Sequence, residues 1–158
     1  MFGDRDFAWL EGLRRTHYPA ERNQVPAHLT LFVQLPPGIE RELAQRLAAY
    51  AGAPAPRARL AGVMDLGNGT AFRVESPELE DVRQGLALAL HGLLSAQDRA
   101  PWSPHVTIQN KVEPREARAL QASLRASFLP RSLAIKGLAA WRYRDGPWEQ
   151  IRSYAFRG

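Results

Sequence analysis

A four-residue pattern that occurs twice, each time ahead of the same series of elements, constrains the fold of this chain most. Residues 28–31 (HLTL) and 105–108 (HVTI) both read His, any residue, Thr, aliphatic residue. Aligning the two patterns also places Pro37 on Pro114, and a helix-like segment follows each proline. A glycine–aliphatic pair and a hairpin-like stretch follow each helix. We therefore expect two halves of strand–helix–hairpin order, related by a pseudo-twofold axis.

Apolar spacing predicts the helices of these halves. Four segments carry apolar residues at helical intervals: 5–17, 39–50, 77–94 and 114–128. The third has the clearest start, because Ser76 can cap a helix and Pro77 suits its first position.

Strand patterns lie between these helices. Short segments with β-branched residues occur at 27–33 and 105–110, and hairpin patterns occur at 62–75 and 133–156. The first hairpin is expected to turn at Gly67-Asn68-Gly69 and the second at Asp145-Gly146-Pro147. Residues 53–58 and 96–104 are expected to be loops. The order predicts an α+β fold, and the length suits a single domain over residues 1–158.

The two motifs place like side chains on one face of each strand. Residues i and i+2 of a strand point to the same side, so His28 shares a face with Thr30, and His105 with Thr107. A pseudo-twofold pairing of the halves would bring both faces to one groove. Phosphodiester hydrolysis needs a base for the attacking oxygen and an acid for the leaving oxygen, and two imidazoles can supply both near neutral pH. The threonine hydroxyls can hydrogen-bond phosphate oxygens, and this chemistry requires no metal ion.

Each motif taken alone has a plainer explanation. A single histidine on a strand is most often structural or solvent-exposed, and threonine favours strands through its β-branched side chain. The repetition of the motif within matching halves is what favours a functional site.

Composition narrows the alternatives. Apolar residues make up 45% of the chain and charged residues 23%, which are ordinary globular values. The net charge is +5, and only Lys111 and Lys136 of the 21 basic residues are lysines. Arginine suits phosphate because its planar fork can donate two hydrogen bonds to one anion. A genome rich in arginine codons explains the same bias, so both interpretations stay open.

The absence of cysteine excludes a disulfide scaffold, a thiolate metal site and a cysteine nucleophile. The first fifteen residues lack the apolar core of a signal peptide. The longest uncharged apolar run, residues 85–94, is too short to cross a bilayer. We expect a soluble cytoplasmic protein that needs no cofactor, no membrane and no obligate protein partner and that acts as a monomer.

HLTL and HVTI, in strand–helix–hairpin halves, resemble the signature motifs of the 2H phosphoesterase superfamily, which includes 2′-5′ RNA ligases and RNA cyclic phosphodiesterases. The resemblance implies a bilobal α+β fold, with antiparallel sheets forming a central groove and helices outside. It implies His28 and His105 as catalytic residues, and Thr30 and Thr107 as phosphate-binding residues. The implied substrates are RNA ends or nucleotides that carry a 2′,3′-cyclic phosphate.

Four further residues are candidates for substrate contact. RNA-ligase-type members carry an arginine soon after the second motif, where this chain offers Lys111. Trp102 precedes the second motif and could stack on a base, although core or rim packing is the commoner role of a tryptophan. Arg142 and Arg144 alternate with aromatic residues, which predicts a basic strand face that contacts RNA or is simply solvated.

The residues favour a metal-independent phosphodiesterase, with two alternatives. The same acid and base could join RNA ends through a 2′-5′ linkage, or the site could bind RNA or a nucleotide without turnover. The sequence does not decide which histidine is the acid and which is the base, because in a pseudo-symmetric site the roles depend on the direction of the substrate.

Overall fold

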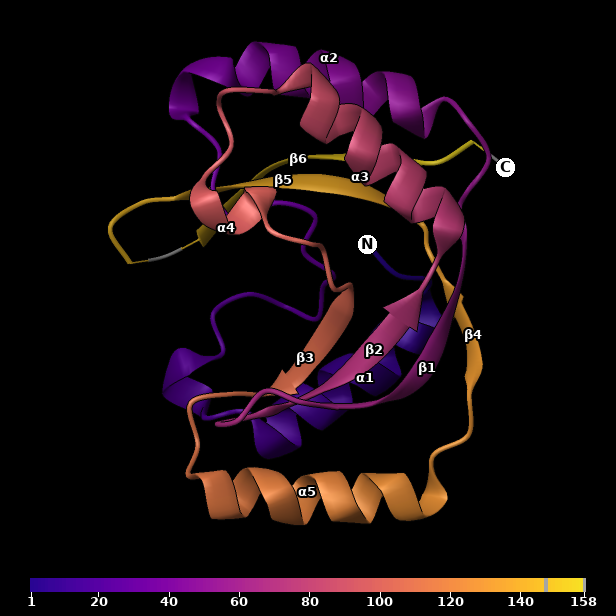
Figure 1. The fold of residues 1–158 in the computed structure, drawn as a ribbon, viewed down its shortest axis with the longest axis vertical. Coiled ribbons are helices and arrows are strands. Elements are labelled where there is room, and N and C mark those ends of the chain that lie inside the picture. Colours follow the sequence, from indigo (N-terminus) through magenta and orange to yellow (C-terminus); the bar gives the residue numbers. More distant parts are fainter. Residues whose placement is uncertain (147, 158) are drawn as a thin grey trace.

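Two antiparallel sheets organise the computed structural model, which describes residues 1–146 and 148–157 (Figure 1). The larger sheet has the order β3-β2-β1-β4, and the smaller one pairs β5 with β6. The strands are β1 (Arg57–Asp65), β2 (Thr70–Glu75), β3 (His105–Gln109), β4 (Arg131–Ala134), β5 (Gly137–Tyr143) and β6 (Trp148–Ala155). This arrangement confirms the α+β fold class.

The four expected helices are present as α1 (Asp4–His17), α2 (Glu40–Ala51), α3 (Pro77–Ala89) and α5 (Pro114–Ser127). Ser76 caps α3, because its Oγ accepts the backbone N–H of Leu79 at 3.2 Å. The third helix ends at Ala89 and not at residue 94, and Gly92 follows with a φ of 85° that a helix does not accommodate. Figure 1 shows α2 and α3 at one end of the molecule and α5 at the other.

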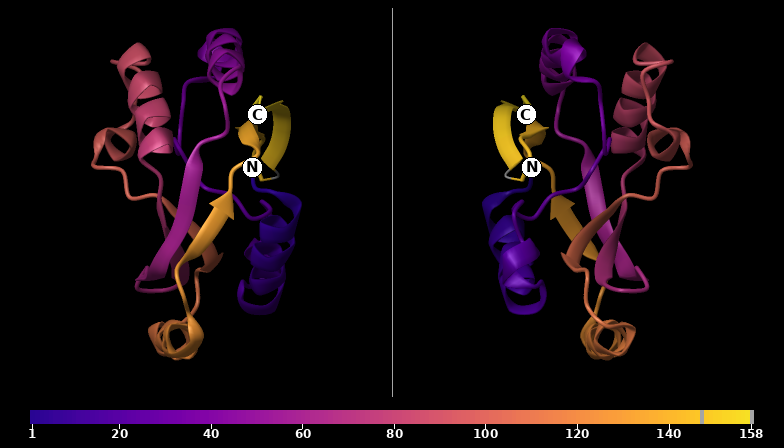
Figure 2. Two further views of the ribbon diagram at one scale, coloured as in Figure 1. Left: turned by 90° about the vertical axis from the view of Figure 1, so that its right-hand side faces the viewer. Right: turned by 90° about the vertical axis from the view of Figure 1, so that its left-hand side faces the viewer.

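A stack of aromatic rings marks the main core, on one face of the larger sheet. Phe72 of β2 is buried between Trp9 of α1, at a centroid distance of 5.2 Å, and Phe128, at 5.4 Å. Val106 and Ile108 of β3 are completely buried in the same cluster. The side views place α1 against the sheet (Figure 2). The opposite face of the sheet is therefore left for the side chains of His105 and Thr107.

The two halves exchange their packing partners. The second motif strand, β3, pairs with β2, which belongs to the hairpin of the first half. Helix α5 packs on β1 and β2, whereas α2 packs on β5 and β6. Each half therefore places its helix on the hairpin of the other half, so the core forms only when both halves are present.

Both expected hairpins form, as β1–β2 and β5–β6. The first turns at residues 66–69, where the N–H of Leu66 donates to the carbonyl of Gly69. The second turns after Tyr143, and Asp145 and Gly146 both have positive φ. Pro147, the third residue of that expected turn, lies outside the described residues.

Three details of the sequence-based prediction are wrong. Residues 27–33 form no strand, and residues 96–104 are not all loop, because Ala96–Arg99 forms α4 with Ser95 as its cap. The expected loop at 53–58 ends early, because β1 begins at Arg57 and pairs with β4, a strand that precedes the second hairpin. Two short 3-10 helices, Ala20–Arg22 and Pro37–Ile39, flank the first motif.

Candidate active site

The second motif lies on β3 with the predicted alternation. Val106 and Ile108 are fully buried, and His105 and Thr107 face the other side. The ladder with β2 sets their position, with His105 opposite Arg73 and Thr107 opposite Ala71. Backbone hydrogen bonds of a sheet therefore hold this half of the candidate site.

The first motif is not paired in a ladder, and the chain bends on either side of Thr30, at Ala27 and at Leu31. The two leucines of the motif pack into different hydrophobic clusters. Leu29 contacts the main core, and Leu31 contacts the cluster of Leu47, Leu86 and Leu138. Thr30 is exposed between them. The segment thus crosses from one sheet to the other, which turns its polar side chains toward the space between the sheets.

Side chains satisfy the backbone of this segment. The indole Nε1 of Trp102 donates to the carbonyl of Thr30 at 3.0 Å, and Nε of Arg83 donates to the carbonyl of Leu31 at 3.0 Å. Asp98, which is buried in α4, accepts the N–H groups of Val33 at 2.7 Å and Gln34 at 3.1 Å. These bonds replace a ladder, which is why the strand predicted at 27–33 does not form.

Both motif histidines are oriented in the same way. Nδ1 of His28 lies 2.7 Å from the carbonyl oxygen of Pro26, and Nδ1 of His105 lies 2.7 Å from that of Ser103. A carbonyl only accepts hydrogen bonds, so Nδ1 carries the proton in each ring. Nε2 of each imidazole is therefore the nitrogen that can exchange a proton with a substrate.

The environment of His28 favours the neutral imidazole. Burial lowers the pKa of His28 below its usual value, and the positive charges of Arg14, the N-terminal amine and His105 lower it further. The hydrogen bond to the carbonyl of Pro26 opposes these effects in part. Hydrogen bonds connect the two motifs in space, because Arg14 bonds to the carbonyls of Val25 and Thr107 and Trp102 bonds to the carbonyl of Thr30.

A groove of about 1070 Å³ runs along the first motif. His28 and Thr30 line one side of it, and β5 lines the other through residues that include Trp141 and Arg142. His105 and Thr107 lie outside this lining. The groove therefore extends from the first histidine along the unpaired edge of β5.

The structure places the four candidate contact residues differently from one another. Lys111 follows the end of β3 that is remote from His105, with a φ of 61°, and its side chain is exposed. Arg142 lines the groove and pairs with Glu40, whereas Arg144 is exposed and pairs with Glu149 at 2.9 Å. Trp102 joins the two motifs through its bond to Thr30. Among these four, Trp102 contacts the first motif, and Arg142 lines the same groove as His28 and Thr30.

Sequence reasoning missed the residues that support the first motif. Arg14 follows Leu10 by four positions on the buried side of α1, and its guanidinium bonds to the backbone near both motifs. Arg83 lies between the rings of Phe32 and Trp102, with centroid distances of 4.9 Å and 5.4 Å. The one signal available for Arg14 was its place on the apolar stripe, where a charge is unusual.

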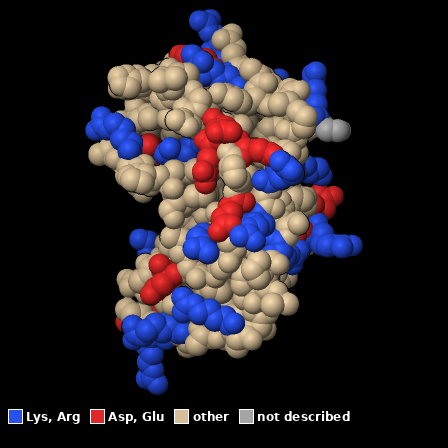
Figure 3. Space-filling model, turned by 45° about the vertical axis from the view of Figure 1, so that its right-hand side comes forward, with Lys and Arg blue, Asp and Glu red and all other residues tan. Residues whose placement is uncertain are grey.

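Charge is balanced locally over part of the surface. Ion pairs join Arg57 to Glu78 at 2.7 Å and Arg59 to Glu75 at 2.6 Å. Figure 3 shows acidic and basic side chains side by side on one face of the molecule. On that face, the Lys and Arg side chains that the structure describes form no continuous basic patch.

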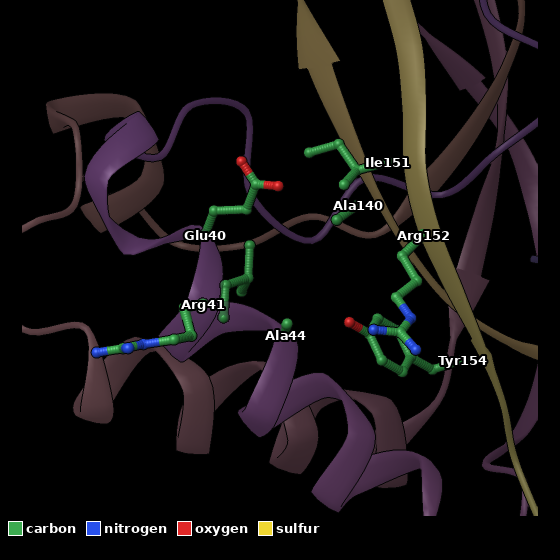
Figure 4. A pocket seen from close by; sticks show the side chains of 8 residues that line it. Glu40, Arg41, Ala44, Ala140, Ile151, Arg152 and Tyr154 are labelled. Carbon is green, nitrogen blue, oxygen red and sulfur yellow. The ribbon is translucent and has the colours of Figure 1, made fainter.

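A second hollow, of about 590 Å³, lies between α2 and the β5–β6 hairpin. Figure 4 shows Ala44 of α2 on one side of this hollow and Arg152 and Tyr154 of β6 on the other, while the side chain of Arg41 points away from β6. None of its lining residues belongs to either motif, but it adjoins the groove, since Glu40, Leu43, Ala140 and Ile151 line both.

Two searches of the described residues gave negative results. Within 1–146 and 148–157, no three His, Asp or Glu side chains are grouped so that they could hold a metal ion. No helix in the described part of the chain combines the length and apolarity needed to cross a membrane.

Comparison with known proteins adds the family and the fold. The sequence profile of the family described as the 2′-5′ RNA ligase superfamily matches residues 2–147. The crystal structure of TT0787 from Thermus thermophilus is similar with a TM-score of 0.60 and 20% sequence identity, over 99% of this chain and 94% of that chain. At this identity the likeness shows a shared fold. No curated protein matches the chain in sequence.

Proposed function

The chain belongs to the 2′-5′ RNA ligase superfamily, and from that premise we propose that it hydrolyses the 2′,3′-cyclic phosphate of RNA ends or nucleotides. The observation that supports this proposal best is the common orientation of the two motif histidines. Each donates from Nδ1 to a backbone carbonyl and keeps Nε2 for proton transfer. A site that only binds phosphate would not need two imidazoles prepared in this way.

His28 is the general base in the proposed reaction, because its lowered pKa keeps the imidazole neutral. Nε2 of His28 takes a proton from water while the water oxygen forms a bond to phosphorus. The bond from phosphorus to one ribose oxygen breaks, and Nε2 of protonated His105 gives that oxygen its proton. One water molecule is consumed, and the product is a 2′- or 3′-phosphomonoester.

Thr30 and Thr107 stabilise the developing negative charge in this proposal. Each lies two residues after its histidine, and each hydroxyl can donate to a non-bridging phosphate oxygen. Arg142 and Trp141 on β5 extend the site along the groove and provide contacts for the nucleotide that carries the phosphate. No cofactor is part of this mechanism.

The family name supports a second candidate function, the joining of RNA ends through a 2′-5′ linkage. A 5′-hydroxyl then replaces water as the attacking group, and the same base and acid act. Hydrolysis releases a phosphomonoester, whereas joining leaves a phosphodiester, so the products distinguish the two.

A substrate panel tests the proposal. The four 2′,3′-cyclic nucleotides, an RNA oligomer with a cyclic-phosphate end and a pair of joinable RNA ends are incubated with the protein, with and without EDTA. We expect hydrolysis of at least one cyclic phosphate in EDTA, and no turnover by the double variant His28→Ala/His105→Ala. Salt-dependent RNA binding without any turnover would contradict the proposal and would favour the alternative of a non-catalytic RNA-binding module.

The proposed reaction needs residues from both halves, so we propose that residues 1–158 act as one catalytic domain and as a monomer. Light scattering after size-exclusion chromatography tests the monomer. Activity confined to a larger species would contradict it. The cytoplasmic location stays a prediction from the sequence.

A further inference from the structure

One arginine is almost completely buried next to both motifs. Arg14, in the last turn of α1, is 3% exposed. Its guanidinium donates to the carbonyl of Thr107 at 2.6 Å, to Oδ1 of Asn23 at 2.7 Å and to the carbonyl of Val25 at 2.8 Å. One side chain therefore holds two chain segments that are remote in sequence.

Each of these bonds is close to a motif histidine along the chain. Thr107 belongs to the second motif itself, two residues after His105. Val25 precedes Pro26, whose carbonyl accepts Nδ1 of His28. Helix α1 thus connects the backbone that orients His28 to the strand that carries His105.

Stability alone does not explain a cation in this place. Nε of Arg14 is buried without a hydrogen bond, and the nearest acid, Glu11, lies 4.0 Å from it. Oε2 of Glu11 also accepts the N–H of Ala27 at 2.7 Å. A buried charge that depends mainly on carbonyl oxygens is expensive, and apolar side chains often replace buried ion pairs without loss of stability.

We propose that Arg14 is a positioning residue of the two-histidine site, which holds the backbones of both motifs so that the two Nε2 atoms face one phosphate. This inference rests on the proposed function. The planar fork of arginine suits the task, because it reaches several acceptors in a fixed geometry that a lysine cannot reproduce.

The charge of Arg14 has a second, measurable effect. It lowers the pKa of His28, after the larger effect of burial. The other charged groups that act on His28 are the N-terminal amine and His105, and both act in the same direction. Removing the charge of Arg14 should therefore raise the pKa of His28.

Three variants separate position from charge. Arg14→Gln removes the charge and the fork, Arg14→Lys keeps the charge, and Arg5→Gln is the control, because Arg5 is an exposed residue of the same helix. The pKa of His28 is measured by NMR titration of the histidine ring protons, which needs no substrate. The pH profile of kcat is measured with a 2′,3′-cyclic nucleotide.

We expect Arg14→Gln to raise the pKa of His28 and to lower kcat about a hundredfold, the cost of a misplacement of about 1 Å. Arg14→Lys should lower kcat by a similar factor and leave the pKa of His28 nearer to that of the parent protein. Arg5→Gln should change neither quantity.

Arg14→Gln with an unchanged kcat and an unchanged pKa of His28 would overturn the proposal. If Arg14→Gln does not fold, Asn23→Ala replaces it, because it removes one partner of the guanidinium and keeps the charge. If the loss of kcat in Asn23→Ala is explained entirely by a smaller folded fraction of the variant, the proposal is also overturned. If the parent protein turns over no substrate, the proposed function fails, and the NMR titration still reports on Arg14.

Discussion

The two motifs have almost the same sequence, but different interactions hold them. The second is a strand, paired with β2 and placed by backbone hydrogen bonds. The first belongs to no sheet, and the side chains of Trp102, Arg83 and Asp98 hold its backbone and that of the residues after it. The histidines are nevertheless oriented alike, through the same Nδ1–carbonyl bond. Equivalent chemistry therefore does not require equivalent secondary structure.

This difference has a practical consequence. A sheet ladder distributes its hydrogen bonds over many backbone groups, so single substitutions affect it little. A segment held by side chains depends on each of them. Substitutions around the first motif should therefore be more damaging than substitutions around the second, apart from the histidines themselves.

The largest expected effect comes from the histidines, where the two motifs should be equally sensitive. His28→Ala and His105→Ala should each lower kcat by a factor of about 10² to 10⁴, the usual contribution of a general acid or base. His91→Ala, an exposed histidine that follows α3, is the control and should keep full activity. Steady-state kinetics on the best substrate of the panel gives the result.

The pH profiles then distinguish the roles. If His28 is the base, activity falls as the pH drops, because His28 becomes protonated. Burial lowers the pKa of His28, so this fall should occur at a pH below the usual pKa range of histidine. If the activity of the parent protein already falls at a pH above the usual pKa range of histidine, His28 is not the base.

Asp98 is the next most sensitive position, and it affects only the first motif. Asp98→Ala removes the carboxylate that accepts the N–H groups of Val33 and Gln34, and because hydrogen bonds to a charged group contribute about 1.5 to 3 kcal/mol each, we expect a loss of about 3 kcal/mol of unfolding free energy. Urea denaturation measures this. The control is Asp81→Ala, an exposed residue of α3 that should change stability by less than about 0.5 kcal/mol. Equal stability of the two variants would mean that side chains do not hold the first motif.

Trp102→Phe is a smaller change at the same segment. It removes the hydrogen bond from the indole N–H to the carbonyl of Thr30 and keeps an aromatic ring, so we expect a loss of about 1 kcal/mol. Trp148→Phe, at the exposed end of β6, is the matched control. Thermal denaturation compares the two, and a larger loss from Trp148→Phe would contradict the proposed support of Thr30 by Trp102.

The smallest effect is a pH dependence of stability that arises from His28 of the first motif. The unfolded imidazole binds its proton near pH 6.5, and folded His28 binds it at a lower pH. Between these two values the unfolded chain binds more protons, so stability falls as the pH drops through this range. His28→Asn should make the denaturation midpoint less dependent on pH across the range. An unchanged slope would show that His28 is not the group responsible.

The chemistry of the candidate site stays a prediction from the sequence, and its arrangement could be predicted only in part. The spacing of His28 and Thr30, and of His105 and Thr107, predicted shared faces, and the repeat predicted that the faces would meet. The supporting residues were not predictable in the same way, since Arg14, Arg83 and Asp98 are separated from the segments that they hold by 9 to 93 positions. No local pattern indicates such contacts.

The sequence by itself determined the elements whose signals are local. The cap of α3 at Ser76, the apolar stripes of the four helices, the β1–β2 turn at glycine and the alternation along β3 all depend on neighbouring residues, and all are present in the structure. The tertiary structure alone decided whether each motif would be a strand, because a strand needs a partner with free backbone groups. For residues 105–109 that partner was β2. For residues 27–33, side chains from α3, α4 and the loop before β3 satisfied the backbone groups instead.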